Sequence, residues 1–585
     1  MHQPHWKDVW RYRFDNFMAR GGSSIFLSLV VMFIAAWAVL SLVRALVYGL
    51  MPTGSDAKGL FGQFWFVFLN LTDPGTMALD VPARSPYKIV AILSGFTGVI
   101  IFSMLIAFIT TTLAEKMSYL RKGHSRVLEK GHTLILGWNE RVVEILRELI
   151  MANESESHAS VVILSERDKE WMDDFLDVNL AESGTTRIVT RSGNTASPAQ
   201  LERVATSECK SVIVLASCRD MDGDELKALS DAKAIKTILA LRTIEPLGEP
   251  FGVVAEVFSA RNRRIIKELT QGEVIAIDTS EILAKILVQT SRSGGLSVVY
   301  SELLSFDGCE LYFYNDKRWG EMVFGDLQFH FPDGVPIGIR RVDGELLINP
   351  AVGTTIGGDD DILIVAEDNS TIEFRPQPVA SSRDLPLKAG RLEHTKERNL
   401  ILGWNPKAPL IIREYEDYVL EDSDIVVMVK EATAAVRAEI YALQNTLTQI
   451  NLYFIEEDPA KIESLLEVKP FTFDNIIILS QSGTGIDGEK SDSDTIILLL
   501  LLREIFAQHA DEAKQTKLIT EVMESDNQDL VSRVGVDDFI ISNRLVSMIF
   551  AQISEEHDMK RVYDDLFSED GSEIYLKPAS LYFDE

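Results

Sequence analysis

The chain contains 585 residues and carries a formal net charge of −31 at pH 7. This length is too great for a single compact core, so we expect several structural units. The strong negative charge excludes a nucleic-acid-binding protein, because an acidic surface repels the phosphate backbone and the sequence shows no separate basic patch.

Two long apolar runs predict membrane-spanning helices at about 24–50 and 88–116, within a pore domain at 23–117. The first run has no charged residue from Ser24 to Val43, which is enough to cross about 30 Å of hydrocarbon as a helix. Arg44 follows, and its long side chain is expected to snorkel to the interface. Basic residues precede the first run in the segment 1–22 and follow the second in a linker at 118–131, so the positive-inside rule places both ends in the cytoplasm.

The connection between the spans predicts a re-entrant pore segment at about 60–76. Its first part, LFGQFWFVFLNLT, is aromatic and apolar but too short to cross the membrane. It leads into the polar residues Thr72, Asp73, Pro74, Gly75 and Thr76, a non-helical stretch that is tolerated at membrane depth only beside protein or water. Four copies of Asp73 around an axis would attract cations. The alternative is an ordinary extracellular loop with an interfacial helix.

The remaining chain contains one strand, Gly turn and helix pattern twice. GHTLILGWN at 131–139 recurs as ERNLILGWN at 397–405, SVIVLASC at 211–218 recurs as NIIILSQS at 475–482, and GVVAEV at 252–257 recurs as LITEVM at 518–523. Alternating strands and helices predict parallel, doubly wound sheets. We therefore predict two Rossmann-like domains at 132–295 and 396–585, with a small α+β subdomain at 296–380 between them.

Two residues of the first copy are candidates for binding a nucleotide cofactor. Gly137 occupies the first glycine position of a phosphate-binding turn, and Glu166 lies at the end of the second predicted strand, where a ribose-binding acid would be. The other glycines of that motif are absent, and Trp138 and Trp404 stand where a phosphate would approach. Nucleotide binding therefore stays open, because the fold also serves ligand sensing without that cofactor.

Acidic residues follow the equivalent strands of the two copies, in RDMDGDE at 219–225 and DGEKSDSD at 487–494. The carboxyl ends of parallel strands are where open α/β sheets bind ligands, and carboxylate oxygens suit Ca²⁺. The candidate metal ligands are Asp222, Asp224, Glu225, Asp492 and Asp494, with Glu256 and Glu521 at the ends of equivalent strands. The same residue types are also ordinary helix caps and turn formers, so both interpretations stay open.

Several stretches together resemble the CASTOR/POLLUX family of ion channels. They are LRKGHSRVLEKGHTLILGWNERVVEILRELIMANES at 120–155, RSGNTASPAQLERV at 191–204, SVIVLA at 211–216, and LLINP with GDDDILIVAED within 346–368. The resemblance implies a homotetramer whose eight RCK-type domains, the kind that regulates potassium conductance, form a ring beneath the pore and pull on its inner helices. It also implies Ca²⁺ regulation, and it places Asp73 and Gly75 in an acidic, glycine-containing filter.

These features predict a ligand-regulated cation channel rather than an enzyme. Its fold would be an α-helical two-span membrane pore fused to α/β tandem Rossmann-like (RCK) domains with a small α+β subdomain. Its partners would be the lipid bilayer and cations, and two spans favour a multi-pass protein of the cell membrane over the nuclear envelope of the plant members. The alternatives are a regulatory subunit of a cation transport system and a membrane-tethered NAD-dependent oxidoreductase.

Overall fold

The computed structural model describes residues 22–51, 59–80, 83–121, 123, 125–180, 182–220, 222–247, 250–379, 396–480, 488–510, 516–534 and 538–582. They form two compact units, Met1–Gly123 and His124–Glu585. The predicted segment 1–22 lies outside the described residues except for its last position, and so does position 487 of the second acidic stretch.

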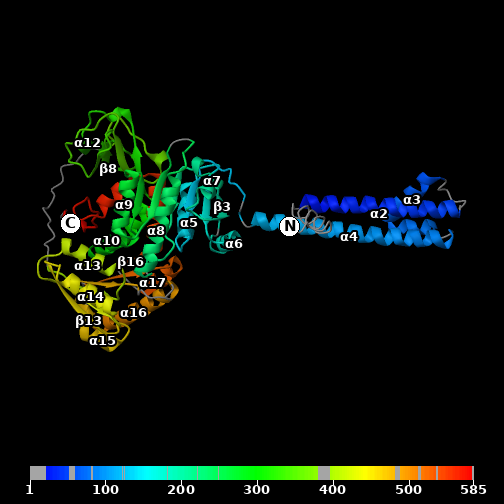
Figure 1. Ribbon diagram of the computed structural model, residues 1–585. Coiled ribbons are helices and arrows are strands. Elements are labelled where there is room, and N and C mark those ends of the chain that lie inside the picture. The colour runs from blue at the N-terminus through cyan, green and yellow to red at the C-terminus, as the bar shows by residue number, and fades with distance from the viewer. Residues whose placement is uncertain are drawn as a thin grey trace, which may run out of the picture. The chain divides into compact units, whose positions relative to one another are not determined.

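The first unit contains two long helices and a shorter one beside them (Figure 1). Its elements are α2 (Gly22–Leu50), α3 (Leu60–Thr72), the 3-10 helix η1 (Pro74–Asp80) and α4 (Ser85–Arg121). Ser24–Leu50 and Ser85–Ser118 are long and apolar enough to cross a membrane, as the sequence predicted. Large apolar side chains such as Leu46 and Ile106 are mostly exposed in this unit, which leaves an apolar surface that lipid would cover.

The polar stretch after the pore helix is more regular than the sequence predicted. Thr72 is still the last residue of α3, Asp73 alone has an extended backbone, and η1 begins at Pro74. Proline suits this start because its fixed φ angle matches the first helical position, where its missing N–H is not needed. The expectation of a non-helical loop at Thr72–Thr76 is therefore wrong for every residue except Asp73.

Helix α4 packs against the carboxyl end of α3 at Gly98. A Cβ atom at Gly98 would lie only 2.0 Å from the carbonyl oxygen of Leu71, so no larger residue fits without moving the pore helix. Small residues permit this kind of close backbone approach between membrane helices. The carboxyl end of α3 is thus fixed by direct contact with α4.

The second unit contains two parallel six-stranded sheets with the same strand order, which confirms the predicted α/β fold and its repeat. The orders are β3-β2-β1-β4-β5-β6 and β13-β12-β11-β14-β15-β16. The first domain comprises β1 (Thr133–Leu136), α5 (Val142–Ala152), β2 (Ser160–Ser165), α6 (Lys169–Asn179), β3 (Arg187–Ser192), α7 (Pro198–Arg203), β4 (Ser211–Val214), α8 (Asp224–Leu241), β5 (Gly252–Glu256), α9 (Ala260–Thr270), β6 (Val274–Ile277) and α10 (Thr279–Arg292).

The second domain repeats this plan in the same order. It comprises β11 (Arg398–Leu402), α13 (Ala408–Tyr418), β12 (Ser423–Val429), α14 (Ala434–Gln444), β13 (Ile450–Glu456), α15 (Ile462–Val468), β14 (Asn475–Ile478), α16 (Gly488–Gln508), β15 (Lys517–Val522), α17 (Gln528–Val534), β16 (Asp538–Ile541), α18 (Ser542–Glu555) and α19 (Met559–Leu566). Central strands such as β1 and β14 are buried at every residue, which explains their continuous apolar sequences.

A smaller sheet lies between the two domains in the sequence, as predicted for the α+β subdomain. It follows α11 (Leu296–Leu304) and is antiparallel, with the order β7-β10-β8-β9. Its elements are β7 (Glu310–Tyr314), α12 (Phe324–Leu327), β8 (Val335–Arg340), β9 (Leu346–Ile348) and β10 (Asp361–Ala366). It has a hydrophobic core of its own, centred on Trp319 and Phe374.

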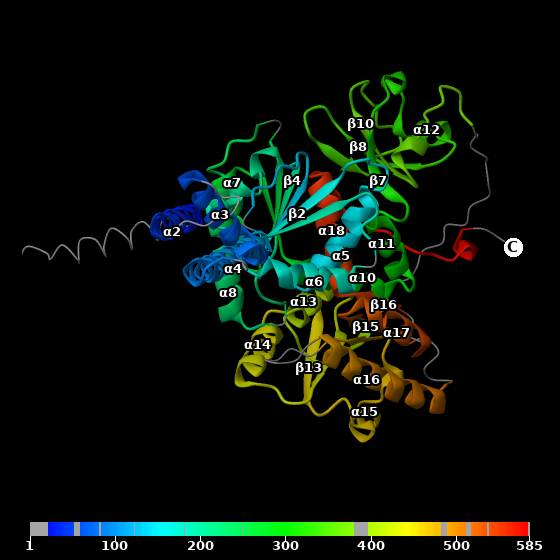
Figure 2. The ribbon, with the colours of Figure 1, turned by 90° about the vertical axis from the view of Figure 1, so that its right-hand side faces the viewer.

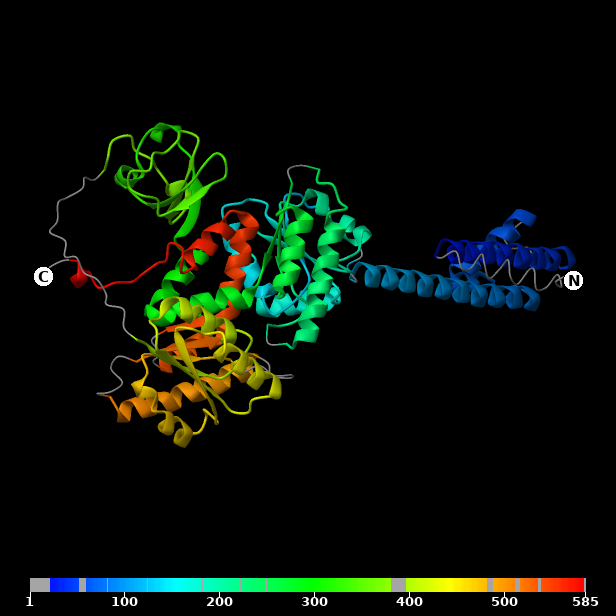
Figure 3. The same ribbon diagram turned by 60° about the vertical axis from the view of Figure 1, so that its left-hand side comes forward.

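The two Rossmann-like domains exchange the helices that follow their sixth strands. Helix α10 of the first domain packs on α13 and on strands of the second sheet, whereas α18 of the second domain packs on α5, β4 and β5 of the first. Figures 2 and 3 show α18, in red, lying against the first domain. Because one continuous hydrophobic core contains residues of both domains, a shift in one domain is transmitted to the other.

The buried side chain of Glu148 makes the stability of the folded state depend on pH. Glu148 lies on α5 and accepts a hydrogen bond from the backbone N–H of Phe306 at 3.2 Å. Burial raises the pKa of Glu148 from its ordinary 4.5 to about 7, against the opposing effect of that hydrogen bond. Between these two values the folded state holds a proton that the unfolded state has lost, so the folded state becomes less stable as pH rises from about 4.5 to about 7.

We expect Glu148→Gln to remove this pH dependence. The variant should be up to about 3 kcal/mol more stable than the wild type at pH 8 and should match it near pH 4.5, because the amide carbonyl still accepts from Phe306 without carrying a charge. Urea unfolding at both pH values measures the difference. Glu154→Gln, at an exposed position, is the control, and an equal response of both variants would contradict the prediction.

Candidate functional site

The predicted filter residues surround the junction of α3 and η1. The carboxylate of Asp73 accepts a hydrogen bond from the N–H of Gly75 at 2.9 Å, and Thr76 donates its hydroxyl to the side chain of Asn70 at 2.7 Å. Thr72 donates its hydroxyl to a backbone carbonyl of α3. Asp73 and Gly75 are exposed, so the carboxylate that caps this turn also faces outward from the chain. This arrangement presents an exposed acidic side chain at the carboxyl end of α3.

The expectation that Arg44 snorkels to the interface is wrong. Arg44 is 3 % exposed and makes a bidentate ion pair with Asp80, at the end of η1, with N–O distances of 2.7 and 2.8 Å. A buried carboxylate that matches the guanidinium geometry satisfies the charge inside the unit, so the side chain does not need to reach water.

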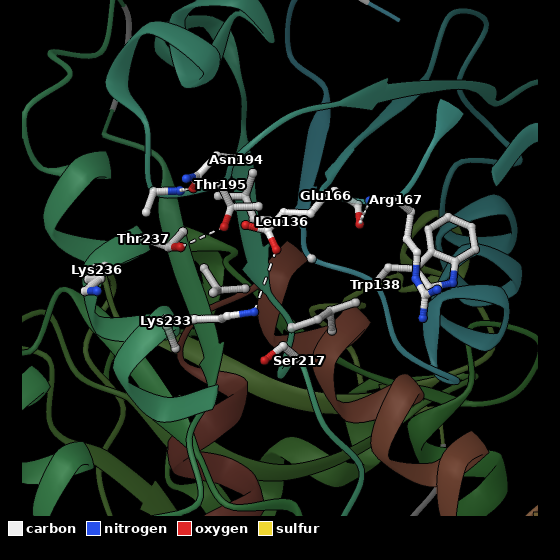
Figure 4. A pocket seen from close by; sticks show the side chains of 16 residues that line it. Leu136, Trp138, Glu166, Arg167, Asn194, Thr195, Ser217, Lys233, Lys236 and Thr237 are labelled. Carbon is white, nitrogen blue, oxygen red and sulfur yellow. Dashed lines mark hydrogen bonds and ion pairs between the residues drawn. The ribbon is translucent and has the colours of Figure 1, made fainter. Parts of the chain in front are cut away.

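In the first Rossmann-like domain, a crevice of about 400 Å³ opens at the carboxyl ends of the central strands (Figure 4). Its walls come from the ends of β1, β2, β3 and β4 and from one face of α8. Gly137 and Glu166, the two candidates for binding a nucleotide cofactor, both lie in its lining. This is the position at which open parallel sheets bind ligands, because the strand order reverses there.

Gly137 serves the packing of the crevice floor. Its φ angle is 111°, and a Cβ atom there would lie 2.9 Å from the carbonyl oxygen of Leu215. Trp138 turns sideways and packs edge-on against Trp171 and Phe175 of α6, with ring centroids 5.6 and 5.7 Å away. Glycine is therefore required at position 137 for the turn and for the contact with the loop after β4. This requirement does not depend on a bound phosphate.

The amino terminus of α5, where a dinucleotide would place its pyrophosphate, is acidic. Glu140 precedes the helix and Glu144 lies in its first turn. Burial raises the pKa of Glu140, the nearby Asp220 adds to this effect, and Arg141 opposes it. Two carboxylates at this position oppose the binding of a phosphate, so the geometry argues against a conventional dinucleotide site.

Positive charge, in contrast, comes from three residues that line the crevice itself. Arg167 follows β2, and Lys233 and Lys236 line the crevice from α8; Figure 4 shows Lys233 reaching toward the centre of the crevice. Lys233 approaches the carboxylate of Glu166 at 3.7 Å, and both side chains are about half exposed. Three cations against one carboxylate give the crevice a net positive charge within a strongly acidic chain.

The same domain contains a buried ion cluster that sequence reasoning missed. Arg141 donates to Glu256 and, at 2.6 Å, to Asp220, and all three side chains are almost completely buried. Thr279, at the start of the exchanged helix α10, donates to Asp220 at 3.0 Å. Burial raises the pKa of Glu256 to about 7 despite Arg141, because one guanidinium cannot neutralise two carboxylates. The cluster connects α5, the loop after β4, β5 and α10.

The second domain has an equivalent cluster in which lysine replaces arginine. Lys407 donates to Glu521 at 2.6 Å, and Ser542, at the start of α18, donates to the same carboxylate at 2.5 Å. Lys407 also lowers the pKa of Asp220 across the domain boundary, together with Arg141 and against the effect of burial. The repeats GWNER and GWNPK already aligned Arg141 with Lys407, which was the available signal.

The predicted metal ligands are dispersed. Glu256 and Glu521 occur at equivalent strand ends as predicted, but they are taken up by the ion clusters. Asp222 accepts from the backbone of its own loop, and Asp224 and Glu225 are exposed in the first turn of α8. Across the described residues, no three His, Cys, Asp or Glu side chains come close enough to hold a metal ion.

Asp492 and Asp494 lie on helix α16, not in the loop that the sequence suggested. Asp492 is buried and accepts from the N–H groups of Met523 and Glu524 and from Asn527, all within 2.9 Å. Asp231, on α8, makes the same three contacts after β5. The true counterpart of Asp492 is therefore Asp231, and its role is to join a helix to the turn after a strand.

Two protein-family models match separate segments of the second unit. The family described as Castor and Pollux, part of voltage-gated ion channel, matches residues 280–381. The calcium-activated potassium channel slowpoke-like RCK domain matches residues 129–267. The solved structure of the human SLO3 gating ring covers 75 % of this chain, and this chain covers 84 % of it, with a TM-score of 0.53 and 12 % identity, which supports the fold alone.

Similarity to curated proteins extends over nearly the whole chain. The ion channel CASTOR of Lotus japonicus is 29 % identical to this chain over an alignment 577 residues long, which covers 92 % of this chain and 65 % of that protein. The chain thus spans slightly less than two thirds of that relative's length. The calcium-gated potassium channel TvoK of Thermoplasma volcanium is 24 % identical over 243 residues, or 42 % of this chain and 63 % of that protein.

Proposed function

Because this chain is a homologue of the CASTOR/POLLUX ion channels and carries RCK-like domains, we propose that it forms a ligand-regulated cation channel rather than an enzyme. The observation that carries the proposal is the presence, in one homologous chain, of a two-helix unit with a pore helix and a tandem pair of Rossmann-like sensor domains. Thr72, Asp73, Pro74, Gly75 and Thr76 would line the ion entrance.

The proposed assembly is a homotetramer in the cell membrane with both termini in the cytoplasm. A single Asp73 carboxylate would face lipid at a large cost, whereas four copies around an axis would surround a path for cations. Helix α4 has 37 residues, or about 55 Å, so it exceeds the hydrocarbon thickness. The linker at 118–131 would transmit the force.

The proposed ligand of the first crevice is a small phosphorylated molecule of the nucleotide type. Arg167, Lys233 and Lys236 would hold its phosphates, and Glu166 would accept hydrogen bonds from its hydroxyl groups. This binding mode differs from a dinucleotide site because the phosphates lie away from the acidic start of α5. A ligand there would regulate the pore only if it binds the open and closed assemblies with different affinity.

Ca²⁺ is the second proposed regulator, supported by the similarity to a calcium-gated channel. Asp222, Asp224 and Glu225 are the residues that remain available for it on the first domain. Ca²⁺ needs six to eight oxygen ligands, so a site built on this short stretch would require further ligands from another copy of the chain. Asp220, two residues before Asp222, would connect such a site to helix α10.

The direct test is current through planar bilayers that contain the purified full-length protein, under K⁺, Na⁺ and Ca²⁺ gradients. Cytoplasmic Ca²⁺ and ATP are stepped separately. Cation current that responds to either would support the proposal. A folded, tetrameric protein that stays silent in all these conditions would overturn it and favour a regulatory subunit of a transport system.

We expect Lys233→Glu and Lys236→Glu each to weaken ATP binding to the purified protein about tenfold or more, since each change replaces an attraction to phosphate with a repulsion. Isothermal titration calorimetry measures the Kd. Lys317→Glu changes the same charge on an exposed lysine outside the crevice and should leave the Kd unchanged. Equal weakening by all three variants would indicate a general charge effect and would contradict a site in the crevice.

A further inference from the structure

Arg44 lies where the four elements described in the first unit meet. It belongs to α2, pairs with Asp80 at the end of η1, and donates through Nε to the side-chain oxygen of Gln63 on α3 at 3.0 Å. Its guanidinium also lies 5.1 Å from the ring of Phe66 on α3 and 5.5 Å from the ring of Tyr87 on α4. One side chain therefore connects four elements.

The network is buried inside a single chain. Arg44, Gln63 and Asp80 are between 1 and 5 % exposed, and Tyr87 is 1 % exposed and donates its hydroxyl to the carbonyl oxygen of Met51 at 3.0 Å. An ion pair removed from water is held only where its geometry is good and its other hydrogen-bonding groups are satisfied. Here the guanidinium finds a bidentate carboxylate, an amide oxygen and two aromatic rings.

Asp80 connects this network to the segment that begins at Asp73. Asp80 ends the same short 3-10 helix that starts one residue after Asp73, so the segment 73–80 is fixed at both ends. At the Asp73 end, Gly98 of α4 packs against the last turn of α3. At the other end, Arg44 pairs with Asp80. A rigid segment between two fixed ends keeps the exposed Asp73 carboxylate in one place.

We propose that Arg44 and Asp80 form a clamp that holds the filter segment 73–80 in its conducting geometry, with Gln63 orienting the guanidinium. Arg44 and Asp80 are thus positioning residues for ion permeation and touch no permeating ion. The clamp rests on the proposed channel function for its effect on current, whereas its effect on the mobility of the segment is independent of conduction.

The test compares Arg44→Gln, Asp80→Asn and the exchanged pair Arg44→Asp with Asp80→Arg in the full-length protein. Each single variant should lower the cation flux about tenfold or more and shift the K⁺ to Na⁺ permeability ratio, because one buried charge loses its partner. The exchanged pair should recover flux to within about threefold of the wild type, because it restores the attraction. Arg84→Gln, at an exposed arginine of the same unit, should change neither quantity.

A second measurement separates failure of the clamp from failure of the channel proposal. Ala78→Cys places a thiol at an exposed position of the segment 73–80, and its rate of reaction with a water-soluble thiol reagent reports the mobility of the segment. The single clamp variants should raise this rate about tenfold and the exchanged pair should restore it, even if no current is observed. Unchanged reaction rates, or an exchanged pair no better than the single variants, would overturn the clamp.

Discussion

Arg141→Met should destabilise the first Rossmann-like domain by about 3–5 kcal/mol, because it leaves Asp220 and Glu256 buried without their shared cation. Methionine fills a similar volume, so lost packing contributes little. Urea unfolding of the full-length protein in detergent, followed at pH 8, measures the change. In the wild-type protein both carboxylates are predominantly ionised at that pH, since burial raises the pKa of Glu256 to only about 7 and Arg141 helps to hold the pKa of Asp220 below its ordinary value.

The matched control is Arg147→Met, six residues further along the chain and within α5. Arg147 is 42 % exposed and pairs with Glu144, and exposed pairs of this kind contribute about 0–1 kcal/mol. Adding Asp220→Asn and Glu256→Gln to Arg141→Met should recover much of the loss, because the remaining groups are neutral. If Arg141→Met and Arg147→Met destabilise equally, the buried carboxylates are not ionised and the cluster has no electrostatic role.

Gly98→Ala should displace the pore helix and abolish most of the current. The new Cβ atom would lie 2.0 Å from the carbonyl oxygen of Leu71 and 2.8 Å from its carbonyl carbon, and backbone atoms cannot rotate away as a side chain can. Overpacking of this kind typically costs about 1–3 kcal/mol and sometimes more. Tetramer yield in detergent and current in planar bilayers measure the two consequences.

Gly49→Ala is the control for this prediction. Gly49 also lies in a spanning helix, but a Cβ atom there would meet nothing within 4 Å. It should therefore retain the wild-type yield and current, and it tests whether alanine is harmful in these helices for other reasons. A Gly98→Ala protein that behaves like Gly49→Ala would show that α3 and α4 are less closely packed in the membrane.

The sequence allowed prediction of elements whose physical cause is local. Continuous apolar runs predict spanning helices and central strands because lipid or protein surrounds them on all sides. The edge strands β3 and β13 were not predicted from the sequence. They are only partly buried, and their sequences mix apolar residues with polar ones. The start of α16 was also not predicted, because Asp and Ser favour turns but also occur at the beginnings of helices.

The candidate sites show the same limit. Gly137 and Glu166 lie in the predicted crevice because the order of strands in a parallel sheet determines which strand ends meet. The sequence could not show that Asp492 lies on a helix and accepts from backbone N–H groups, because a carboxylate with that role and one that binds a metal are the same residue type. Arg44 was misassigned because its partner Asp80 is 36 residues away, beyond the reach of any local pattern.

By itself, the sequence determined the two spans, the repeated α/β pattern and the family resemblance, since each depends on residue types at fixed spacing along the chain. Only the tertiary structure decided that α10 and α18 exchange domains, that Arg141 and Lys407 neutralise buried carboxylates, and that Arg44 connects the filter segment to the spanning helices. These facts depend on burial and on contacts between distant residues, because the same charged side chain is a solvated group at a surface and a fixed partner in a core.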